Sequence, residues 1–284
     1  MGCSASTAGE KAGDAGRGGV DPDAVAARIS RRLMAAGKLT DAVQAFETSV
    51  LQGEPRWDLD LTDEQMELVV DAAYEELREQ LDLAVRRHDD AHAIKLWRVV
   101  RVRGILYGMR GDADREEAEY VGAVGFCRQA KCGGLDLGEC LCTLGKFYED
   151  KRGDYKKAEE QYHQAADEVQ KSVGNANHPG IVRPLQLLAD MFLYRVKARY
   201  SEAAFLYERV LGIVPADSMT ATEVKFCLFE CAAHGKGASK KAEAARWGKA
   251  AVAAYEEQLG AQHQRTLFVV SEVRAWAAAN GAPL

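Results

Sequence analysis

A recurring order of turn residues, a small residue and an aromatic residue constrains the fold of this chain more than any other feature. In its clearest copies, Ala158 is followed four residues later by Tyr162, and Ala203 is followed four residues later by Tyr207. Residues at three- and four-residue steps lie on one face of an α-helix. The corresponding small residues Ala118, Ala158, Ala203 and Ala242 are 40, 45 and 39 residues apart. Intervals of this length predict a helix-turn-helix repeat.

The alternation of small and large residues has a physical reason. Two antiparallel helices joined by a short turn approach closely only where a small side chain lies between them, and an aromatic ring one turn later fills the adjacent space. A plain bundle of amphipathic helices would explain the apolar period but not this repeated order. We therefore expect an all-α fold, a right-handed superhelix of antiparallel helix-turn-helix repeats. The repeats are expected over residues 21–280, most clearly over 135–267, with a final capping helix at about 266–279.

The first twenty residues have a different character. Residues 1–20 hold six glycines and four alanines and contain neither an aromatic residue nor an apolar period. Such a segment buries too little surface to offset the entropy of ordering it, so we expect a flexible leader. Asp21 can cap a helix and Pro22 suits its first position, which predicts that the leader ends there.

The segment GEPRWDLDL, residues 53–61, interrupts the repeats. After it, Thr62 and Gln65 form a capping-box pattern that predicts a long helix to about residue 87. The segment is either a loop that closes over the first hairpin or a boundary between a small N-terminal unit and the main array. We favour one continuous superhelix.

Composition narrows the classes of function. The net charge of -6 and the pI of about 5.6 come from charges spread along the chain, so we expect no nucleic-acid partner. No apolar run approaches the span of about 20 residues that crosses a bilayer, and no secretory signal is visible. The expected compartment is therefore cytoplasmic, where the 7 cysteines would be reduced thiols.

Two stretches carry a resemblance to a known family. Residues 141–179, LCTLGKFYEDKRGDYKKAEEQYHQAADEVQKSVGNANHP, resemble a tetratricopeptide repeat of the long variety found in kinesin light chains. Residues 258–267, QLGAQHQRTL, resemble the join between such repeats. The chain departs from the pattern by one additional residue in 174–178 and by Gln264, where the join usually has proline.

The resemblance implies a concave groove that binds a partner protein. In the kinesin light chain pattern L-N-N-L-A-x-x-Y, the asparagines help to hold a peptide backbone. The matching stretches here are LCTLGKFY (141–148) and LQLLADMF (185–192), so both asparagines are replaced and the family's cargo or motor role is not carried over. From the repeat register, the exposed groove residues are predicted to be Thr143, Lys146, Gln186 and Asp190.

Three groups of residues have the elements of a metal site. They are Cys127, Cys132, Cys140 and Cys142; Cys227, Cys231 and His234; and His88 with His92. The first group lacks paired C-x2-C knuckles, the second also describes a buried helix stripe, and helix capping by the aspartates between them explains the third. The chain contains no H-E-x-x-H, G-x-S-x-G, phosphate-loop or G-x-G-x-x-G motif. We expect no metal, no cofactor and no enzyme activity.

The opening residues MGCSAS match the N-myristoylation pattern M-G-x-x-x-[ST]. Gly2 is the predicted myristoyl acceptor and Cys3, directly after it, the predicted palmitoyl acceptor. One myristoyl chain binds membranes only marginally, with a partition constant of about 10⁴ M⁻¹, so a second lipid matters. The charges of the leader balance one another and cannot supply that second signal. In the alternative, Gly2 is unmodified and the leader has no anchoring role.

The combined prediction is a non-enzymatic adaptor or scaffold. It would bind proteins in its groove and lie at the cytoplasmic face of a membrane through its lipids. The alternative is a soluble repeat subunit of a larger transport or regulatory complex without lipid. An enzyme with a site among the cysteines is the third possibility.

Overall fold

The described part of the chain consists of helices joined by turns. The computed structural model describes residues 97, 100–101, 103–105, 107–108, 110–129, 131, 133–196 and 199–282, and these contain no strand. The chain divides into two compact units, Met1–Ala73 and Tyr74–Leu284, and every described residue lies in the second. The prediction of an all-α fold built from helix-turn-helix repeats is confirmed for these residues.

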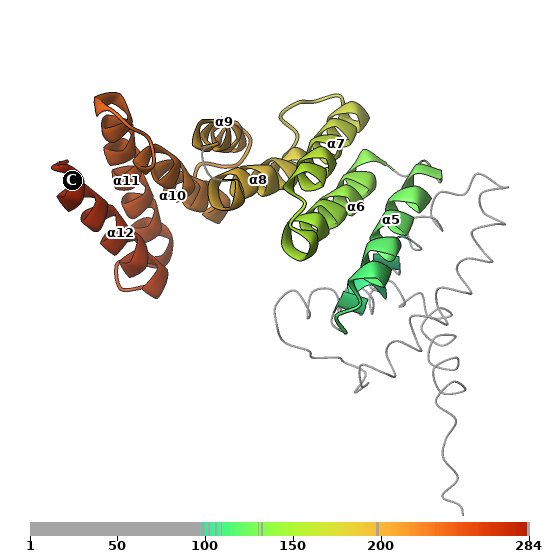
Figure 1. The fold of residues 1–284 in the computed structure, drawn as a ribbon. Coiled ribbons are helices and arrows are strands. Elements are labelled where there is room, and N and C mark those ends of the chain that lie inside the picture. The colour runs from blue at the N-terminus through green and yellow to red at the C-terminus, as the bar shows by residue number, and fades with distance from the viewer. Residues whose placement is uncertain are drawn as a thin grey trace, which may run out of the picture. The chain divides into compact units, whose positions relative to one another are not determined.

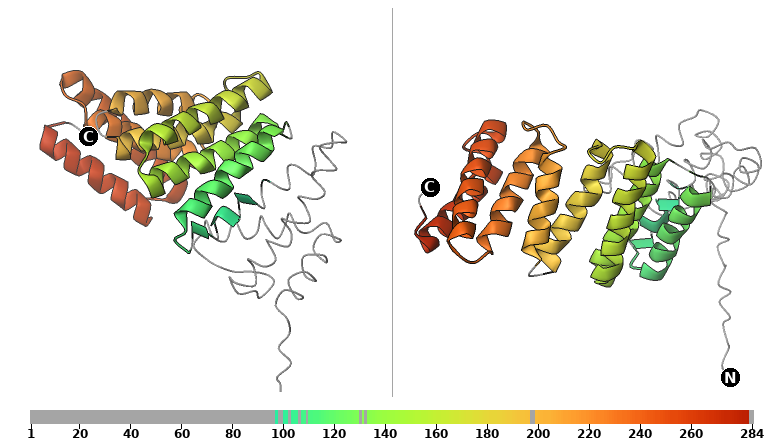
Figure 2. Two further views of the ribbon diagram at one scale, coloured as in Figure 1. Left: turned by 45° about the vertical axis from the view of Figure 1, so that its right-hand side comes forward. Right: turned by 90° about the horizontal axis from the view of Figure 1, so that it is seen from above.

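The helices form successive hairpins (Figure 1). In chain order they are α5 (Ala113–Gln129), α6 (Gly134–Phe147), α7 (Tyr155–Val173), α8 (Val182–Asp190), α9 (Tyr200–Leu211), α10 (Met219–Ala233), α11 (Ala238–Leu259) and α12 (Gln264–Asn280). The π-helical turns η1 (Tyr148–Arg152) and η3 (Met191–Arg195) extend α6 and α8, and the 3-10 turn η2 (Pro179–Ile181) leads into α8. The pairs α6 and α7, α8 and α9, and α10 and α11 pack together, and α12 packs on α11. Figure 2, seen from above, shows the helices following one another in chain order.

The turn inside the first complete hairpin follows from its sequence. Gly153 adopts the left-handed conformation with φ 62°, which glycine reaches without steric cost. The Asp154 side chain then accepts a hydrogen bond from the Lys157 backbone N–H and caps the start of α7. The chain reverses direction within these residues, so α7 packs back on α6.

The join between hairpins uses a different pair of caps. Gly174, with φ 64°, ends α7. The His178 side chain accepts a hydrogen bond from the Gly180 backbone N–H through Nδ1, and Pro179 occupies the first position of η2. The stretch with one residue more than the family pattern is thus a capped turn.

A tyrosine of the second helix packs on a residue of the first helix that has no side chain. A Cβ added to Gly145 would lie 2.6 Å from Cε1 of Tyr162, and one added to Gly104 would lie 2.5 Å from Cε1 of Tyr120. Tyr162 is fully buried, and Ala158 beside it is also buried. Ala158 and Tyr162 are thus both buried as the pattern predicts, but the small residue that faces the ring and sets the distance between the helices is a glycine of the other helix, which the pattern did not identify.

The predicted small positions at Ala118 and Ala242 are wrong, because both residues are exposed. Glu116 and Ala244 are the buried residues of α5 and α11 near these sites. Glu116 fits because Gly108 lies opposite it, where an added Cβ would meet its carboxylate at 2.6 Å. The Tyr120 hydroxyl donates to Glu116 at 3.3 Å, and burial raises the pKa of Glu116. The acidic residue Glu116 therefore occupies the buried position of α5 that the pattern had assigned to Ala118.

The last hairpin reverses the roles of its two helices. Phe229 on α10 is the large residue, and Gly248 on α11 is the small one, with an added Cβ 3.2 Å from the Phe229 ring. Val273 of α12 lies against the same glycine, and these helices share one buried cluster. The final helix is thereby fixed to the array.

Arginines in the turns before α7 and α9 connect these helices to the preceding hairpin. Arg152, before α7, donates to Asp114 at 2.6 Å and to Glu117 at 3.0 Å, both on α5. Arg199, before α9, donates to both carboxylate oxygens of Glu159 on α7, at 2.7 and 3.0 Å. A guanidinium that binds a carboxylate through two N–H groups fixes direction as well as distance. The contacts therefore orient consecutive hairpins.

Several predictions lie outside the described residues and stay predictions: the leader 1–20, the helix expected over 62–87 and the start of the repeat domain at residue 21. The linker 53–61 also lies outside them, and the division between the two units falls at 73/74. None of the helices in the described ranges has the length and apolar character needed to cross a bilayer.

Enlarging the small residue at a helix crossing is expected to destabilise the array. Ala158→Leu inserts methylene groups beside buried Tyr162 and should lower the free energy of unfolding by about 1–3 kcal/mol, because the packed helices cannot make room without strain. Urea denaturation followed by circular dichroism measures the change. Ala253→Leu, on the exposed side of α11, is the matched control and should change stability by less than about 0.5 kcal/mol. Equal effects of the two substitutions would contradict the close-crossing interpretation.

Candidate functional site

The first helices of the hairpins present side chains at matching positions on one surface. In α6, α8 and α10, with the turns that extend them, these positions follow steps of four, three and four residues, which keeps them on one side of each helix. We call this surface the inner face, and four rows of residues define it. The matching positions are Glu139, Arg183 and Glu223 in row one; Thr143, Leu187 and Cys227 in row two; Lys146, Asp190 and Glu230 in row three; and Asp150, Tyr194 and His234 in row four. Residues of the flanking helices are added to the ends of these rows by contact or electrostatic proximity rather than by register: Arg101 and Arg265 to row one, Phe268 to row two and Glu272 to row three.

Row one alternates in charge from helix to helix. Arg101 Nη1 lies 2.6 Å and Arg183 Nη1 lies 2.5 Å from Oε1 of Glu139, so this carboxylate joins two arginines from neighbouring helices. Farther along, Arg265 of α12 pairs with Glu223 of α10 at 3.0 Å. Ion pairs of this kind add little stability when exposed, but they favour one alignment of neighbouring helices.

Row two becomes more apolar towards the C-terminal end. The Thr143 hydroxyl donates to the backbone carbonyl of Glu139 in its own helix. At the other end, Phe268 on α12 is 54% exposed and lies edge-on to Phe226 on α10, with ring centroids 6.1 Å apart. The inner face thus carries an exposed ring, Phe268, that rests on half-buried Phe226 between α10 and α12.

Row three begins with a lysine and continues with carboxylates. Lys146 pairs with Asp150 at 3.4 Å. Asp190 accepts a hydrogen bond from the buried Tyr207 hydroxyl, and Glu230 accepts one from the Tyr194 hydroxyl at 2.6 Å. The partners of these two carboxylates are therefore neutral tyrosines.

Burial and nearby negative charges both act on Asp190 and Glu230 of row three. The pKa of Asp190 is raised, chiefly by burial, and the charges of Glu149 and Glu223 add to this effect. Burial likewise raises the pKa of Glu230, with further contributions from Glu272 and Asp190. Asp190 on α8 and Glu272 on α12 therefore both lie within electrostatic reach of Glu230 on α10.

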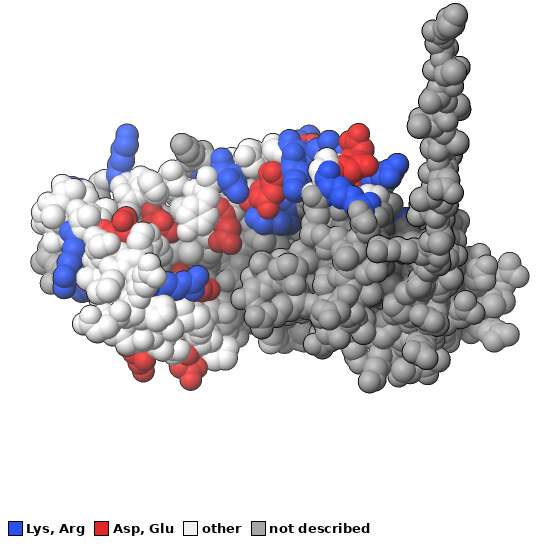
Figure 3. All heavy atoms as spheres, turned by 90° about the horizontal axis from the view of Figure 1, so that it is seen from below, with Lys and Arg blue, Asp and Glu red and all other residues white. Residues whose placement is uncertain are grey.

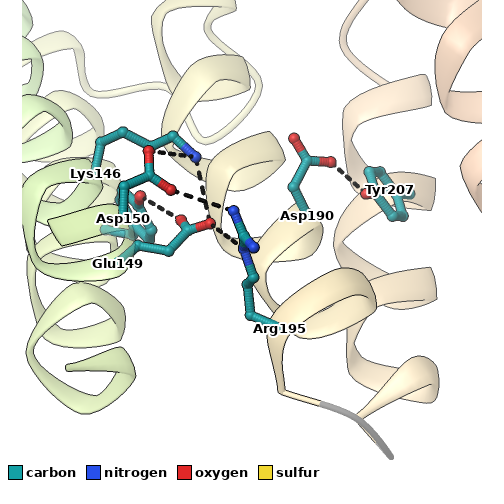
Figure 4. Close-up of polar contacts among 7 residues, drawn as sticks. Lys146, Glu149, Asp150, Asp190, Arg195 and Tyr207 are labelled. Carbon is teal, nitrogen blue, oxygen red and sulfur yellow. Dashed lines mark hydrogen bonds and ion pairs between the residues drawn. The ribbon is translucent and has the colours of Figure 1, made fainter. Parts of the chain in front are cut away.

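A buried carboxylate anchors the other end of the inner face (Figure 4). The side chain of Glu149 is 4% exposed and accepts hydrogen bonds from Tyr162 at 2.9 Å and from Lys146 at 3.3 Å. Arg195 from η3 lies 3.5 Å from Glu149 and 3.4 Å from Asp150, and Figure 4 shows it extending between the two carboxylates. This cluster joins α6 to the next hairpin and balances its own charges.

Four cysteines of the described residues, Cys127, Cys140, Cys142 and Cys231, are buried, and Cys227 is half-buried. Sγ of Cys127 lies 3.4 Å from Sγ of Cys140, and burial raises the pKa values of Cys142 and Cys227 to about 12. The imidazole of His234 stacks on the ring of Tyr200. Within the described ranges, no group of three or more His, Cys, Asp and Glu side chains is arranged to hold a metal ion. His88, His92 and Cys132 lie outside these ranges.

The four predicted groove residues lie on or beside the inner face. Thr143, Lys146 and Asp190 belong to rows two and three, whereas Gln186 directly precedes the row-two residue Leu187. Their role in partner binding stays a prediction. The predicted acylation sites, Gly2 and Cys3, lie outside the described residues.

The sequence prediction did not include Arg183, Glu223, Tyr194, Glu230 or Phe268. The available signal was the separation of the paired residues, which is 44 for Glu139 and Arg183 and 42 for Glu223 and Arg265. Charges of opposite sign one repeat apart predict contact between neighbouring first helices once the repeat register is known.

Comparison with known proteins gave similarities among solved structures alone. No model of a known family matches the chain, and no curated protein matches its sequence. The chain is similar to the nearly identical TPR-like repeats of a Podosopora anserina protein described as a kinesin light chain. A crystal structure of a single-substitution form of these repeats has 17% identity and a TM-score of 0.42, with 92% of this chain and 97% of that chain covered. A second crystal structure of these repeats has 16% identity and a TM-score of 0.37, with 92% and 98% covered. BtubC (BKLC) from P. vanneervenii has 16% identity and a TM-score of 0.42, with 92% and 91% covered.

Removing the buried carboxylate is expected to weaken the array. Glu149→Leu leaves the buried Tyr162 hydroxyl without its acceptor and removes one contact each from Lys146 and Arg195, so it should cost about 3 kcal/mol of stability. Equilibrium urea unfolding measures the loss.

The neighbouring residue provides the control. Asp150→Leu also removes contacts to Lys146 and Arg195 but keeps the bond between Glu149 and Tyr162, and it should cost less than about 1 kcal/mol. Equal losses in the two variants would show that the surface ion pairs, rather than the buried hydroxyl contact, hold this junction.

Proposed function

We propose that this chain is a non-enzymatic protein-interaction scaffold whose inner face binds a segment of another protein. The main support for this proposal is that the four rows of the inner face run from one first helix to the next. Their charged, polar and aromatic side chains are held at matching positions by a core that packs on the opposite side of each helix. A surface of this kind offers one set of contacts per repeat to a ligand that crosses the helices.

The dimensions of the repeats favour an extended ligand. Packed helices lie about 8–10 Å apart, whereas an extended strand advances about 3.3 Å per residue. Every third residue of an extended segment would therefore meet a new helix of the inner face. The predicted groove residues Thr143, Lys146, Gln186 and Asp190 would supply contacts from α6 and α8.

We further propose that the N-terminus fixes where this scaffold works. Myristate on Gly2 and palmitate on Cys3 would together hold the chain at the cytoplasmic face of a membrane, since one chain alone gives marginal binding. The sequence MGCSAS supports this part of the proposal. The palmitoyl thioester is reversible, so the tether can be removed.

Site-specific cross-linking tests the docking surface. A photoreactive amino acid at Gln186, beside row two, should yield cross-linked protein partners in the cells in which the chain naturally occurs. The same amino acid at Phe205, which is 66% exposed on the second helix α9, is the matched control. We expect discrete products at Gln186 that are absent at Phe205. The same products at both positions, or none at either, would contradict the inner-face proposal.

Mass spectrometry and fractionation test the tether. The intact chain from its own cells should carry a myristoyl increment and a palmitoyl increment, and hydroxylamine should remove the palmitoyl increment alone. Gly2→Ala should move the chain from the membrane fraction to the cytosolic fraction, because neither lipid is then added. An unmodified and fully cytosolic wild-type chain would instead support the alternative, a soluble subunit of a larger complex.

A further inference from the structure

The C-terminal half of the inner face differs from the N-terminal half in its chemistry. We propose that this half, from Tyr194 to Phe268, binds a partner segment in which an apolar side chain is flanked by lysine or arginine. The inference rests on the proposed scaffold function and specifies the chemistry of its partner. Its two components are an exposed aromatic surface and the charge that borders it.

The aromatic surface spans η3, α10 and α12. Tyr194 is 52% exposed and Phe268 is 54% exposed, and Phe226 packs between the core residue Phe229 and the ring of Phe268. Sγ of half-buried Cys227 lies 3.9 Å from the Tyr194 hydroxyl, and Cys227 follows Phe226 directly in α10. In Figure 3, the surface towards the C-terminal end is mostly uncharged, whereas opposite charges lie side by side near the middle. Exposed aromatic side chains grouped on one surface are typical of interaction sites.

Carboxylates border this aromatic surface. Glu230 contacts Tyr194 directly, at 2.6 Å, and Glu272 lies one turn after Phe268 on α12. Burial raises the pKa of Glu230, and the negative charges of Glu272 and Asp190 raise it further, so both groups repel the Glu230 carboxylate. A cation placed among them would relieve this repulsion.

The basic residues Arg183, Arg265 and Lys146 of the inner face are already paired with carboxylates. Arg265 pairs with Glu223 at 3.0 Å, and Arg183 pairs with Glu139 at 2.5 Å. At the N-terminal end, Lys146 pairs with the acidic residues of its own cluster. The excess of negative charge is therefore located beside the aromatic surface.

Charge complementarity selects the occupant. An acidic segment would add like charges to row three, and a wholly apolar segment would remove water from carboxylates without replacing it. A segment with lysine or arginine next to an apolar residue satisfies both components: its apolar side chain covers Phe268 and Phe226, and its cation contacts Glu230 and Glu272. A guanidinium or ammonium group can also stack on the exposed rings.

Selection from random peptides tests this chemistry. A phage-displayed peptide library is panned against the immobilised full chain, and the affinities of the enriched peptides are measured by fluorescence polarisation. We expect enrichment of lysine or arginine next to an apolar residue. Phe268→Ala and Glu272→Lys should each weaken binding by about tenfold or more.

Matched control variants show whether a loss of binding is specific to the inner face or follows from any loss of an aromatic ring or any change of charge. Phe205→Ala, on α9, removes an exposed aromatic ring elsewhere, and Glu257→Lys, on α11, reverses an exposed charge elsewhere. Both should change affinity less than about twofold, because neither residue belongs to the inner face. Unchanged circular dichroism and melting temperature show that all four variants are folded.

The possible outcomes test the chemistry of the partner separately from the proposed scaffold function. Enriched acidic or uncharged peptides whose binding still depends on Phe268 would overturn the inference and leave the scaffold function standing. Enriched peptides indifferent to Phe268→Ala and Glu272→Lys, or no enrichment at all, would also overturn the inference. The Gln186 cross-linking result then decides the scaffold function separately.

Discussion

The contact between a tyrosine ring and a residue without a side chain controls both the core and the surface of this array. Tyr162 reaches the backbone of the preceding helix because Gly145 leaves room for its ring. The hydroxyl of the same tyrosine donates a hydrogen bond to Glu149, and Glu149 also accepts hydrogen bonds from Lys146 and Arg195. One side chain thus sets the spacing of two helices and orients the polar groups at one end of the inner face.

The next hairpin couples core and surface in a related way. Tyr207 is buried between helices, and its hydroxyl donates to Asp190 in row three. A carboxylate held by a buried hydroxyl keeps its position while remaining partly accessible to a ligand. The arginine contacts between hairpins, such as Arg199 with Glu159, then fix each such carboxylate relative to its neighbours. The rows depend on both sets of contacts.

Local features of this fold were predictable from sequence, and features that join distant residues were largely missed. The turn at Gly153 and the pairing of Ala158 with Tyr162 follow from residues close in the chain. The burial of Glu116 was missed because it depends on the space left by Gly108 in another helix. The inner-face prediction likewise named residues from single helices, whereas the surface is defined by pairs such as Tyr194 and Glu230, 36 residues apart.

The alternating charges of row one also restrict how the length of the array can change. Arg101, Glu139, Arg183, Glu223 and Arg265 follow one another from helix to helix. Deleting one hairpin would place two arginines or two glutamates beside each other, whereas deleting two consecutive hairpins would restore the alternation. Duplicating one hairpin would likewise place like charges beside each other, whereas duplicating two consecutive hairpins would keep the alternation. The charges of row one therefore act, besides core packing, on which hairpins can follow one another in the array.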